Sequence, residues 1–135
     1  MSDALYQERI VALARAKTGA GKLASPTRTV RRDNPLCGDR VILDVALDGA
    51  GRIAGIAHQV RGCLLCQASA SALAAVAVGR DAAGVAELRL QADRALGRAE
   101  GEADAPYDAF APVKAHKARQ DCVLLPLEAL KDVFA

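Results

Sequence analysis

The stretch RVILDVALDGAGRIAGIAHQVRG, residues 40–62, decides the fold of this chain. Its first half alternates apolar and polar side chains, so that one face of an extended strand carries Val41, Leu43, Val45 and Leu47. Alternation of period two is typical of a strand with one buried face. The segment DGAG, residues 48–51, supplies a turn, and residues 52–60 return along the first strand. The stretch therefore predicts an antiparallel hairpin.

The chain becomes helical in character after this hairpin. The run CLLCQASASALAAVAVGR is too long and too rich in alanine for a strand, so it predicts a buried helix over about residues 65–78. A second helix, over about residues 81–97, begins at Asp81 as its N-cap and ends at Gly97. The acidic run GRAEGEADAP, residues 97–106, is expected to be a loop.

A last helix is expected from Gln120 or Asp121 to Phe134, where apolar residues recur at helical spacing. Pro126 falls inside this pattern, and proline is tolerated only in the first turn of a helix. This restriction places the predicted helix start close to Cys122.

The part of the chain before the hairpin divides into a helix and a loop. Residues 3–17 place apolar side chains at helical spacing, and Gly19 with Gly21 supplies the stop. Residues 18–36 are expected to form a loop with basic residues at 28, 31 and 32. No internal repeat is present in the sequence, and residues 1–135 are expected to form a single domain.

Composition restricts the class of partner. A formal net charge of +2, with 3% aromatic residues and no tryptophan, argues against nucleic acid and against a membrane surface. Asp3 and Glu8 stand where a secretory signal needs a basic start and an apolar core, so no export signal is expected and the predicted location is the cytoplasm. Four cysteines in a reducing compartment indicate a metal site or reactive thiols more often than disulfides.

Three of the four cysteines share a local context at the ends of predicted elements. Cys37 comes just before a strand, Cys63 lies between a strand and a helix, and Cys122 lies at the expected start of the last helix. Cys66 instead falls in mid-helix, as a core thiol does. A helix N-terminus favours thiolate over thiol, which applies to Cys63 and Cys122.

The cysteine spacing leaves two interpretations open. Only Cys63 and Cys66 form a Cys-x2-Cys pair, so a local zinc ribbon is excluded. One interpretation is a tetrahedral site assembled over long range from Cys37, Cys63 and Cys122, with Asp39 as an oxygen ligand. The other is a set of buried structural thiols.

Three motifs together resemble a known family. These are NPLCGD at 34–39, GCLLCQASASAL at 62–73 and RQDCVLLPLEAL at 119–130, and the opening LYQERI at 5–10 is similar to the family's first helix. They resemble the U-type iron-sulfur cluster assembly proteins, the family of IscU, SufU and the NifU N-terminal domain. The resemblance implies an α+β fold in which a small antiparallel sheet of about three strands packs against several helices.

The resemblance also implies a ligand set, residue by residue. The family's three cysteines match Cys37, Cys63 and Cys122, and its metal-binding aspartate, which makes a bound cluster labile, matches Asp39. Cys66 falls where SufU-like members usually have serine, which is a departure from the family pattern.

Two features indicate the SufU-like branch. Arg119 lies three residues before Cys122, and 59 positions separate Cys63 from Cys122, which leaves room for an insertion. IscU-like members instead place a histidine directly before the third cysteine. His116, in PVKAH, resembles that histidine but is six positions from Cys122 and is interpreted as a surface residue.

For that branch the resemblance implies an enzyme, a zinc-dependent sulfurtransferase that accepts persulfide sulfur on Cys37 from a SufS-like cysteine desulfurase and serves downstream iron-sulfur assembly proteins. One alternative is a scaffold on which a [2Fe-2S] cluster is built and handed on, because the same four ligands suit iron. A second is a non-catalytic, zinc-stabilised interaction protein, because the histidine and Asn-Pro that usually follow the first helix are missing.

Other polar residues receive structural interpretations. Ser69 and Ser71 are assigned to helix packing, and His58 is assigned to a structural role on its strand. Lys114, Lys117 and Arg119 form a basic cluster before Cys122. This cluster is a solvated surface, a means of holding thiolates negative or a contact for a partner, with Arg119 the candidate beside the ligands.

Overall fold

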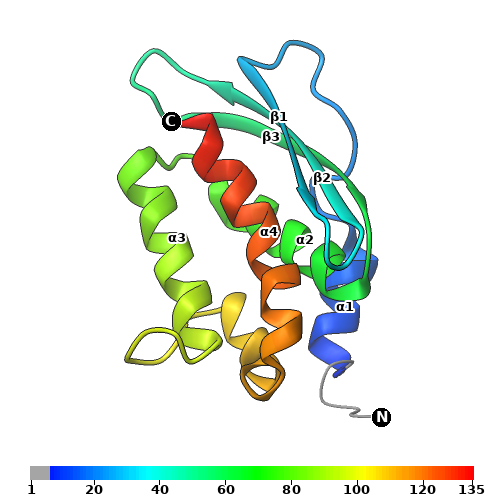
Figure 1. The fold of residues 1–135 in the computed structure, drawn as a ribbon. Helices are drawn as coiled ribbons and strands as arrows, with labels where there is room; N and C mark the ends of the chain where they lie inside the picture. The colour runs from blue at the N-terminus through cyan, green and yellow to red at the C-terminus, as the bar shows by residue number, and fades with distance from the viewer. Residues whose placement is uncertain (1–6) are drawn as a thin grey trace.

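The computed structural model describes residues 7–135 and shows an α+β fold, as expected. Three strands form one antiparallel sheet in the order β1-β2-β3. Helices cover one face of this sheet (Figure 1). The elements in chain order are α1 (Glu8–Ala16), β1 (Arg28–Asn34), β2 (Asp39–Leu47), β3 (Ile53–Arg61), α2 (Leu64–Ala77), α3 (Ala82–Ala95), the 3-10 helix η2 (Tyr107–Ala115) and α4 (Lys117–Val133).

The predicted hairpin is confirmed as β2 and β3. Val41 pairs with Val60 and Val45 pairs with Ile56, so the apolar sides of the two strands face the same way. Val41, Leu43 and Val45 are buried against the helices. The hairpin thus supplies the sheet's contribution to the core, in agreement with its period-two pattern.

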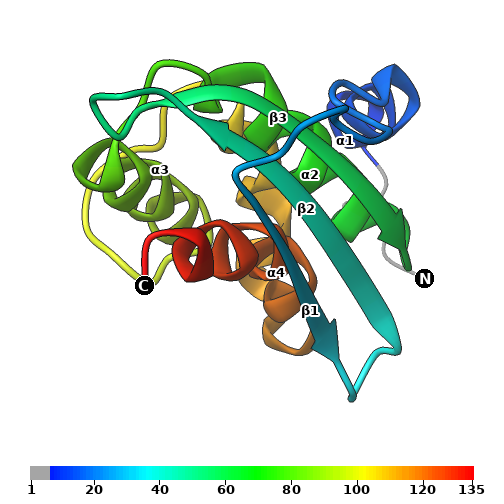
Figure 2. The same cartoon turned by 90° about the horizontal axis from the view of Figure 1, so that it is seen from above.

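The helices form two further layers behind the sheet. α2 packs on β3, α4 packs on β1 and β2, and α3 lies on the far side of α4. The opposite face of the sheet is crossed by the segment between α1 and β1 at the end near the β2–β3 turn (Figure 2). Asp44 fixes that segment, because its carboxylate accepts hydrogen bonds from the Leu23 backbone N–H and the Thr29 hydroxyl.

The prediction that residues 18–36 form a loop was wrong for its last part, which is β1. This strand has no alternating apolar pattern, and only Asn34 at its end is fully buried. Arg32 points toward α4, where it forms an ion pair with Asp132 at 2.9 Å. A salt-bridged arginine therefore takes an inward position where the sequence pattern requires an apolar residue.

The predicted start of the last helix was also wrong. α4 begins at Lys117, and Pro126 lies well inside it. An interior proline costs about 3 kcal/mol because it removes one backbone hydrogen bond and crowds the preceding turn. Burial on most of its circumference outweighs this cost, and the Ser69 hydroxyl of α2 donates to the Val123 carbonyl in the same turn.

The remaining elements agree with expectation in part. α2 and α3 match the predicted helices to within a residue or two, whereas η2 was not predicted. Of the helix expected at 3–17, residues 3–6 lie outside the described part of the chain. Within residues 7–135, no helix has the length and apolar character needed to cross a membrane.

Candidate functional site

The turn between β1 and β2 presents Cys37. Residues 35–38 form this turn, and Cys37 is exposed. The turn is held by Asn34: its side-chain oxygen accepts the Leu36 N–H at 3.1 Å, and its backbone carbonyl accepts the Gly38 N–H at 2.8 Å. Gly38 has a φ of 73°, which glycine adopts without strain. The Asn34 amide also donates to the Cys37 Sγ at 3.5 Å.

Asp39 opens β2 and points inward, with only 2% of its surface exposed. Its Oδ1 accepts the Cys63 backbone N–H at 3.0 Å, and its Oδ2 lies 3.5 Å from the Cys63 Sγ. The carboxylate fits because residue 62 is glycine: a Cβ there would lie 2.3 Å from the Asp39 Oδ1. Asp39 therefore ties the start of β2 to the start of α2.

Cys63 is the N-cap residue of α2. A hydrogen bond from the Cys122 thiol lowers the pKa of Cys63 to about 7, with help from the backbone N–H groups of Cys66 and Leu65. Burial and the neighbouring Asp39 carboxylate oppose this shift. The predicted benefit of a helix N-terminus is thus present at Cys63.

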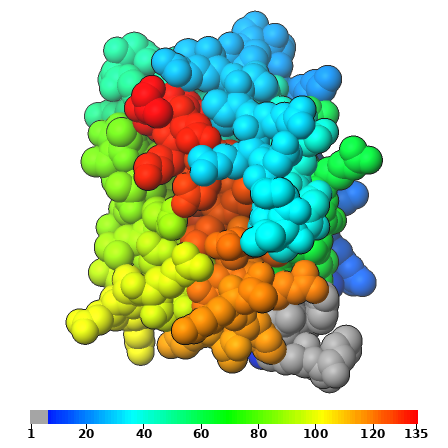
Figure 3. Space-filling view, viewed as in Figure 1, coloured from blue at the N-terminus to red at the C-terminus, as the bar shows by residue number. Residues whose placement is uncertain are grey.

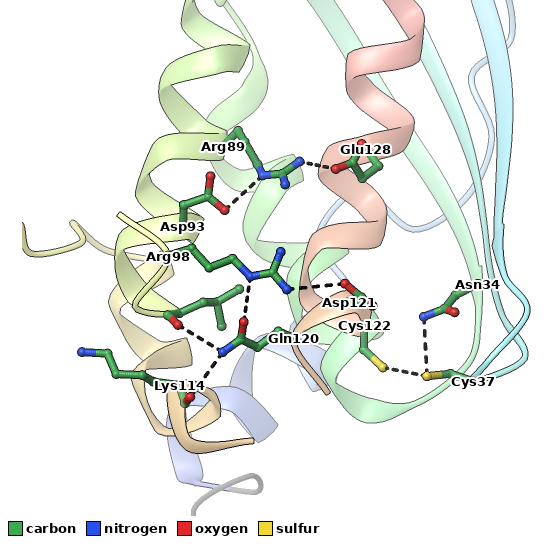
Figure 4. Close-up of polar contacts among 11 residues, drawn as sticks. Asn34, Cys37, Arg89, Asp93, Arg98, Lys114, Gln120, Asp121, Cys122 and Glu128 are labelled. Carbon is green, nitrogen blue, oxygen red and sulfur yellow. Dashed lines mark hydrogen bonds and ion pairs between the residues drawn. The ribbon is translucent and has the colours of Figure 1, made fainter. Parts of the chain in front are cut away.

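Cys122 does not lie at a helix start, because α4 begins before it. It is buried and faces the turn, with its Sγ 3.5 Å from the Cys37 Sγ (Figure 4). Its hydrogen bond to Cys63 and its burial raise the pKa of Cys122. Of this pair, Cys63 carries the negative charge first.

Three of the four predicted ligands gather at one end of the sheet, and the fourth, Cys63, lies beside them. Ligand atoms of Cys37, Asp39 and Cys122 all lie within 4.8 Å of one another, and Cys63 reaches this set through Asp39. A tetrahedral zinc site with Zn–S of about 2.3 Å and Zn–O of about 2.0 Å has edges of about 3.8 Å between sulfurs and about 3.5 Å between sulfur and oxygen. The Cys37–Cys122 and Cys63–Asp39 separations, each 3.5 Å, are close to two opposite edges. Cys37, Asp39 and Cys122 therefore supply donors suited to a metal ion, and Cys63 lies next to Asp39 at the edge of this set.

Cys66 stays out of this cluster. Its side chain is fully buried in α2, and burial raises the pKa of its thiol. The interpretation of Cys66 as a core residue agrees with this position. Ser69 and Ser71 are buried on the same helix, where Ser71 accepts the Thr18 backbone N–H.

Gln120 anchors the helix that carries Cys122. It is buried, and its amide nitrogen donates to the Leu96 and Lys114 carbonyls at 3.1 and 3.2 Å. Its Oε1 accepts from Arg98 at 2.7 Å, and Arg98 also forms an ion pair with Asp121 (Figure 4). The end of α3 and η2 are thereby joined to the first turn of α4.

Arg119 lies one turn before Cys122 on α4 and is half-buried. Its backbone N–H donates to the His116 carbonyl at 2.9 Å. His116 is half-buried at the junction of η2 and α4, whereas Lys114 and Lys117 are exposed.

Three supporting residues were missed from sequence: Asn34, Gly62 and Gln120. All three stand inside the quoted motifs: Gly62 directly precedes Cys63, Gln120 is two residues before Cys122, and Asn34 is three residues before Cys37. Residues that flank a ligand shape the backbone around it, so their place in these motifs was the signal that could have identified them. For Gln120 this signal gives no partner, because Leu96 and Arg98 lie more than twenty residues away in the sequence.

The fold is a three-stranded sheet backed by helices, and three thiols and a carboxylate lie at one end of it. This arrangement is typical of small proteins that bind a metal ion or cluster through cysteines. The family model described as NifU-like N terminal domain matches residues 5–122. The chain belongs to this family, whose members take part in iron-sulfur cluster assembly.

Solved structures and a curated relative agree with this assignment. A nitrogen-fixing NifU-like protein (N-terminal) from Brucella abortus has a TM-score of 0.86 at 29% identity, covering 96% of this chain and 92% of the other. A putative iron-sulfur cluster assembly scaffold protein for the SUF system from Fervidobacterium islandicum has a TM-score of 0.84 at 26% identity, with 97% of both chains covered. The bifunctional protein NifU/MnmA of Rubrobacter xylanophilus is 31% identical over 83 residues, which is 62% of this chain and 17% of that protein.

Proposed function

We propose that this chain is a SufU-like, zinc-dependent sulfurtransferase that takes persulfide sulfur from a SufS-like cysteine desulfurase. The observation that carries the proposal is the contrast between one exposed thiol and the groups behind it. Cys37 is exposed at the tip of a turn, whereas Asp39 and Cys122 are buried and Cys63 is half-buried. A partner protein can therefore reach Cys37 while the other three residues remain in place.

Zinc would be held by Cys37, Asp39, Cys63 and Cys122. Such an ion keeps thiols deprotonated and has no redox activity of its own. Asp39 supplies the one oxygen among sulfur donors, and its carboxylate is already oriented by the Cys63 backbone N–H. Arg119, one turn from Cys122, is proposed to favour negative charge at this end of the molecule.

The transfer step uses Cys37 alone. Its thiolate attacks the outer sulfur of the partner's cysteine persulfide, the S–S bond of that persulfide breaks, and the partner's cysteine leaves as a thiolate. Cys37 then carries the persulfide, and the step needs no added oxidant or reductant. The Asn34 amide, 3.5 Å from the Cys37 Sγ, donates toward the sulfur that acts as nucleophile.

A cluster scaffold is the second candidate. Three thiolates and one carboxylate also suit a [2Fe-2S] cluster, and the oxygen donor would make that cluster easier to release. The solved SUF-system relative is described as a scaffold, which favours this candidate. Transfer to downstream assembly proteins and a cytoplasmic location stay predictions in both cases.

Metal analysis of anaerobically purified protein, with an absorption spectrum and an alanine-release assay, separates the candidates. The sulfurtransferase predicts one zinc per chain, no visible band and faster alanine release by a SufS-like desulfurase. Iron and sulfide in a coloured protein, without faster alanine release, would support the scaffold. Zinc without any effect on the desulfurase would leave a zinc-stabilised interaction protein.

A further inference from the structure

The tip of the β1–β2 hairpin carries an apolar side chain directly beside the acceptor thiol. Leu36 is 89% exposed, although Asn34 holds its backbone in a fixed turn. Among residues 7–135, the other large hydrophobic residue with high exposure is Val78, at the opposite end of α2. In Figure 3 the hairpin tip, drawn in cyan, lies on the surface beside α4.

Two arginines flank this tip on the sheet face that is turned away from the helices. Arg40 and Arg61 are cross-strand neighbours at the end of the β2–β3 ladder. Together with Asp33, Asn34, Pro35, Gly38 and Asp39 they line a surface hollow of about 320 Å³ beside Cys37. We call Leu36, Arg40 and Arg61 the tip patch.

The charge of the tip patch is not balanced by its surroundings. The Asp33 carboxylate forms ion pairs with the guanidinium groups of both Arg31 and Arg40, with N–O distances of 3.1 and 2.9 Å. Arg61 is exposed and has no ion-pair partner among the described residues. Two arginines thus share one exposed carboxylate and a third arginine has none within residues 7–135, which leaves this side positive.

The other side of the turn, toward α3 and α4, is different. There a hollow of about 250 Å³ is also lined by arginines. Arg32 pairs with Asp132, Arg89 with Asp93 and Glu128, and Arg98 with Asp121. Figure 4 shows that two of these arginines are turned toward acidic side chains of α3 and α4. This side is already neutralised within the chain.

We propose that the tip patch is the surface on which the persulfide-bearing desulfurase docks, with an apolar pocket for Leu36 and acidic side chains for Arg40 and Arg61. This inference rests on the proposed function of Cys37 as the acceptor thiol. Leu36 would become buried in the complex and so supply affinity beside the reacting sulfur. The positive charge of Arg40 and Arg61 would steer an acidic partner toward Cys37. Docking on this side brings the partner's persulfide to the exposed flank of Cys37 and leaves the Cys122 side covered.

The test compares two tip variants with two matched controls outside the patch. The tip variants are Leu36→Ser and Arg61→Glu, and the controls are Val78→Ser and Arg52→Glu. Arg52 is an exposed arginine in the β2–β3 turn, at the opposite end of the sheet, and Val78 is the second exposed large apolar residue among those described. All four side chains are exposed, so none of these substitutions removes a core contact.

The dissociation constant for a SufS-like desulfurase is measured by calorimetry, and the KM for each variant is measured by alanine release. Each tip variant is expected to raise both values about tenfold, with kcat nearly unchanged and the controls within about twofold of wild type. Adding salt should weaken wild-type binding more than Arg61→Glu binding. Tip variants that match the controls in both values would overturn the docking surface.

A second readout keeps this outcome separate from the proposed function. Inorganic polysulfide donates sulfur to exposed thiols without a docked protein. Cys37 of the tip variants should therefore gain sulfur from polysulfide at the wild-type rate. If wild-type protein binds the desulfurase through the tip patch but never stimulates alanine release, the sulfurtransferase is wrong and the docking surface stands. If every variant stimulates release with the wild-type KM, the docking surface is wrong and the sulfurtransferase stands.

Discussion

Cys37 and Cys122 lie 3.5 Å apart and yet belong to very different parts of the molecule. Cys37 is exposed in a short turn that is held by one asparagine, whereas Cys122 is buried inside a helix anchored by Gln120. Buried packing fixes a side chain, and a surface turn leaves it accessible. This contrast supports the proposal that Cys37 reacts with a partner protein while Cys122 helps to hold the metal ion.

The largest expected effect comes from removing the exposed thiol. Cys37→Ser should reduce stimulation of the desulfurase to background, because a hydroxyl group cannot carry a persulfide. Cys66→Ser is the control: burial raises the pKa of this thiol and it lies outside the proposed ligand set, so alanine release should stay near wild type. Full stimulation by Cys37→Ser would show that Cys37 is not the acceptor thiol.

The position of the buried Asp39 carboxylate is expected to depend on Gly62. A Cβ there would lie 2.3 Å from the Asp39 Oδ1, so Gly62→Ala should displace the carboxylate and weaken zinc binding. Overpacking of this kind costs about 1–3 kcal/mol in unfolding free energy. The measurements are zinc affinity by chelator competition and urea denaturation of the metal-free protein.

Gly49→Ala is the matched control for Gly62→Ala. A Cβ at Gly49 meets nothing within 4 Å, so both zinc affinity and stability should be unchanged within error. If Gly62→Ala behaved like Gly49→Ala, the position of Asp39 would not depend on the close approach of that backbone.

A smaller effect is expected at Asn34, on the exposed side. Asn34→Ala removes the acceptor of the Leu36 N–H and the donor to Cys37, which should lower the unfolding free energy by about 1 kcal/mol. Asn34→Asp keeps the acceptor and loses the donor, so it should retain most of the stability yet still slow sulfur transfer. Equal transfer rates for Asn34→Asp and wild type would show that the donor has no part in the step.

The smallest effect is a pH dependence far from the thiols. Burial lowers the pKa of His58, whose Nε2 hydrogen-bonds the Thr18 carbonyl at 2.7 Å. The folded state therefore favours the neutral ring, and its contribution to stability is present above the ordinary histidine pKa of about 6.5 and is lost as the pH falls through the lower, folded value. Urea denaturation of metal-free protein between pH 7 and pH 5 should show a steeper loss for wild type than for His58→Gln. Equal slopes would contradict the assigned sign.

Much of this molecule was predictable from local pattern. The hairpin 40–62 and the helix after it have strong periodicity, and each predicted ligand lies in a short motif. The misses have physical causes. β1 places a half-buried, salt-bridged arginine where an apolar side chain is expected, and α4 tolerates Pro126 because packing on most sides outweighs a lost hydrogen bond. Both causes are contacts between residues far apart in the sequence, so local sequence patterns do not reveal them.

The proposal that Cys37 accepts persulfide sulfur is tested most directly by locating the transferred sulfur atom. Wild-type protein is mixed with a SufS-like desulfurase and cysteine without reductant, alkylated, digested and examined by mass spectrometry. One added sulfur increases the mass of a peptide by about 32 Da. If Cys37 is the acceptor thiol, this gain is expected on the peptide that contains Cys37 and on no other. A gain confined to the peptide of Cys122, or to that of Cys63 and Cys66, would contradict it.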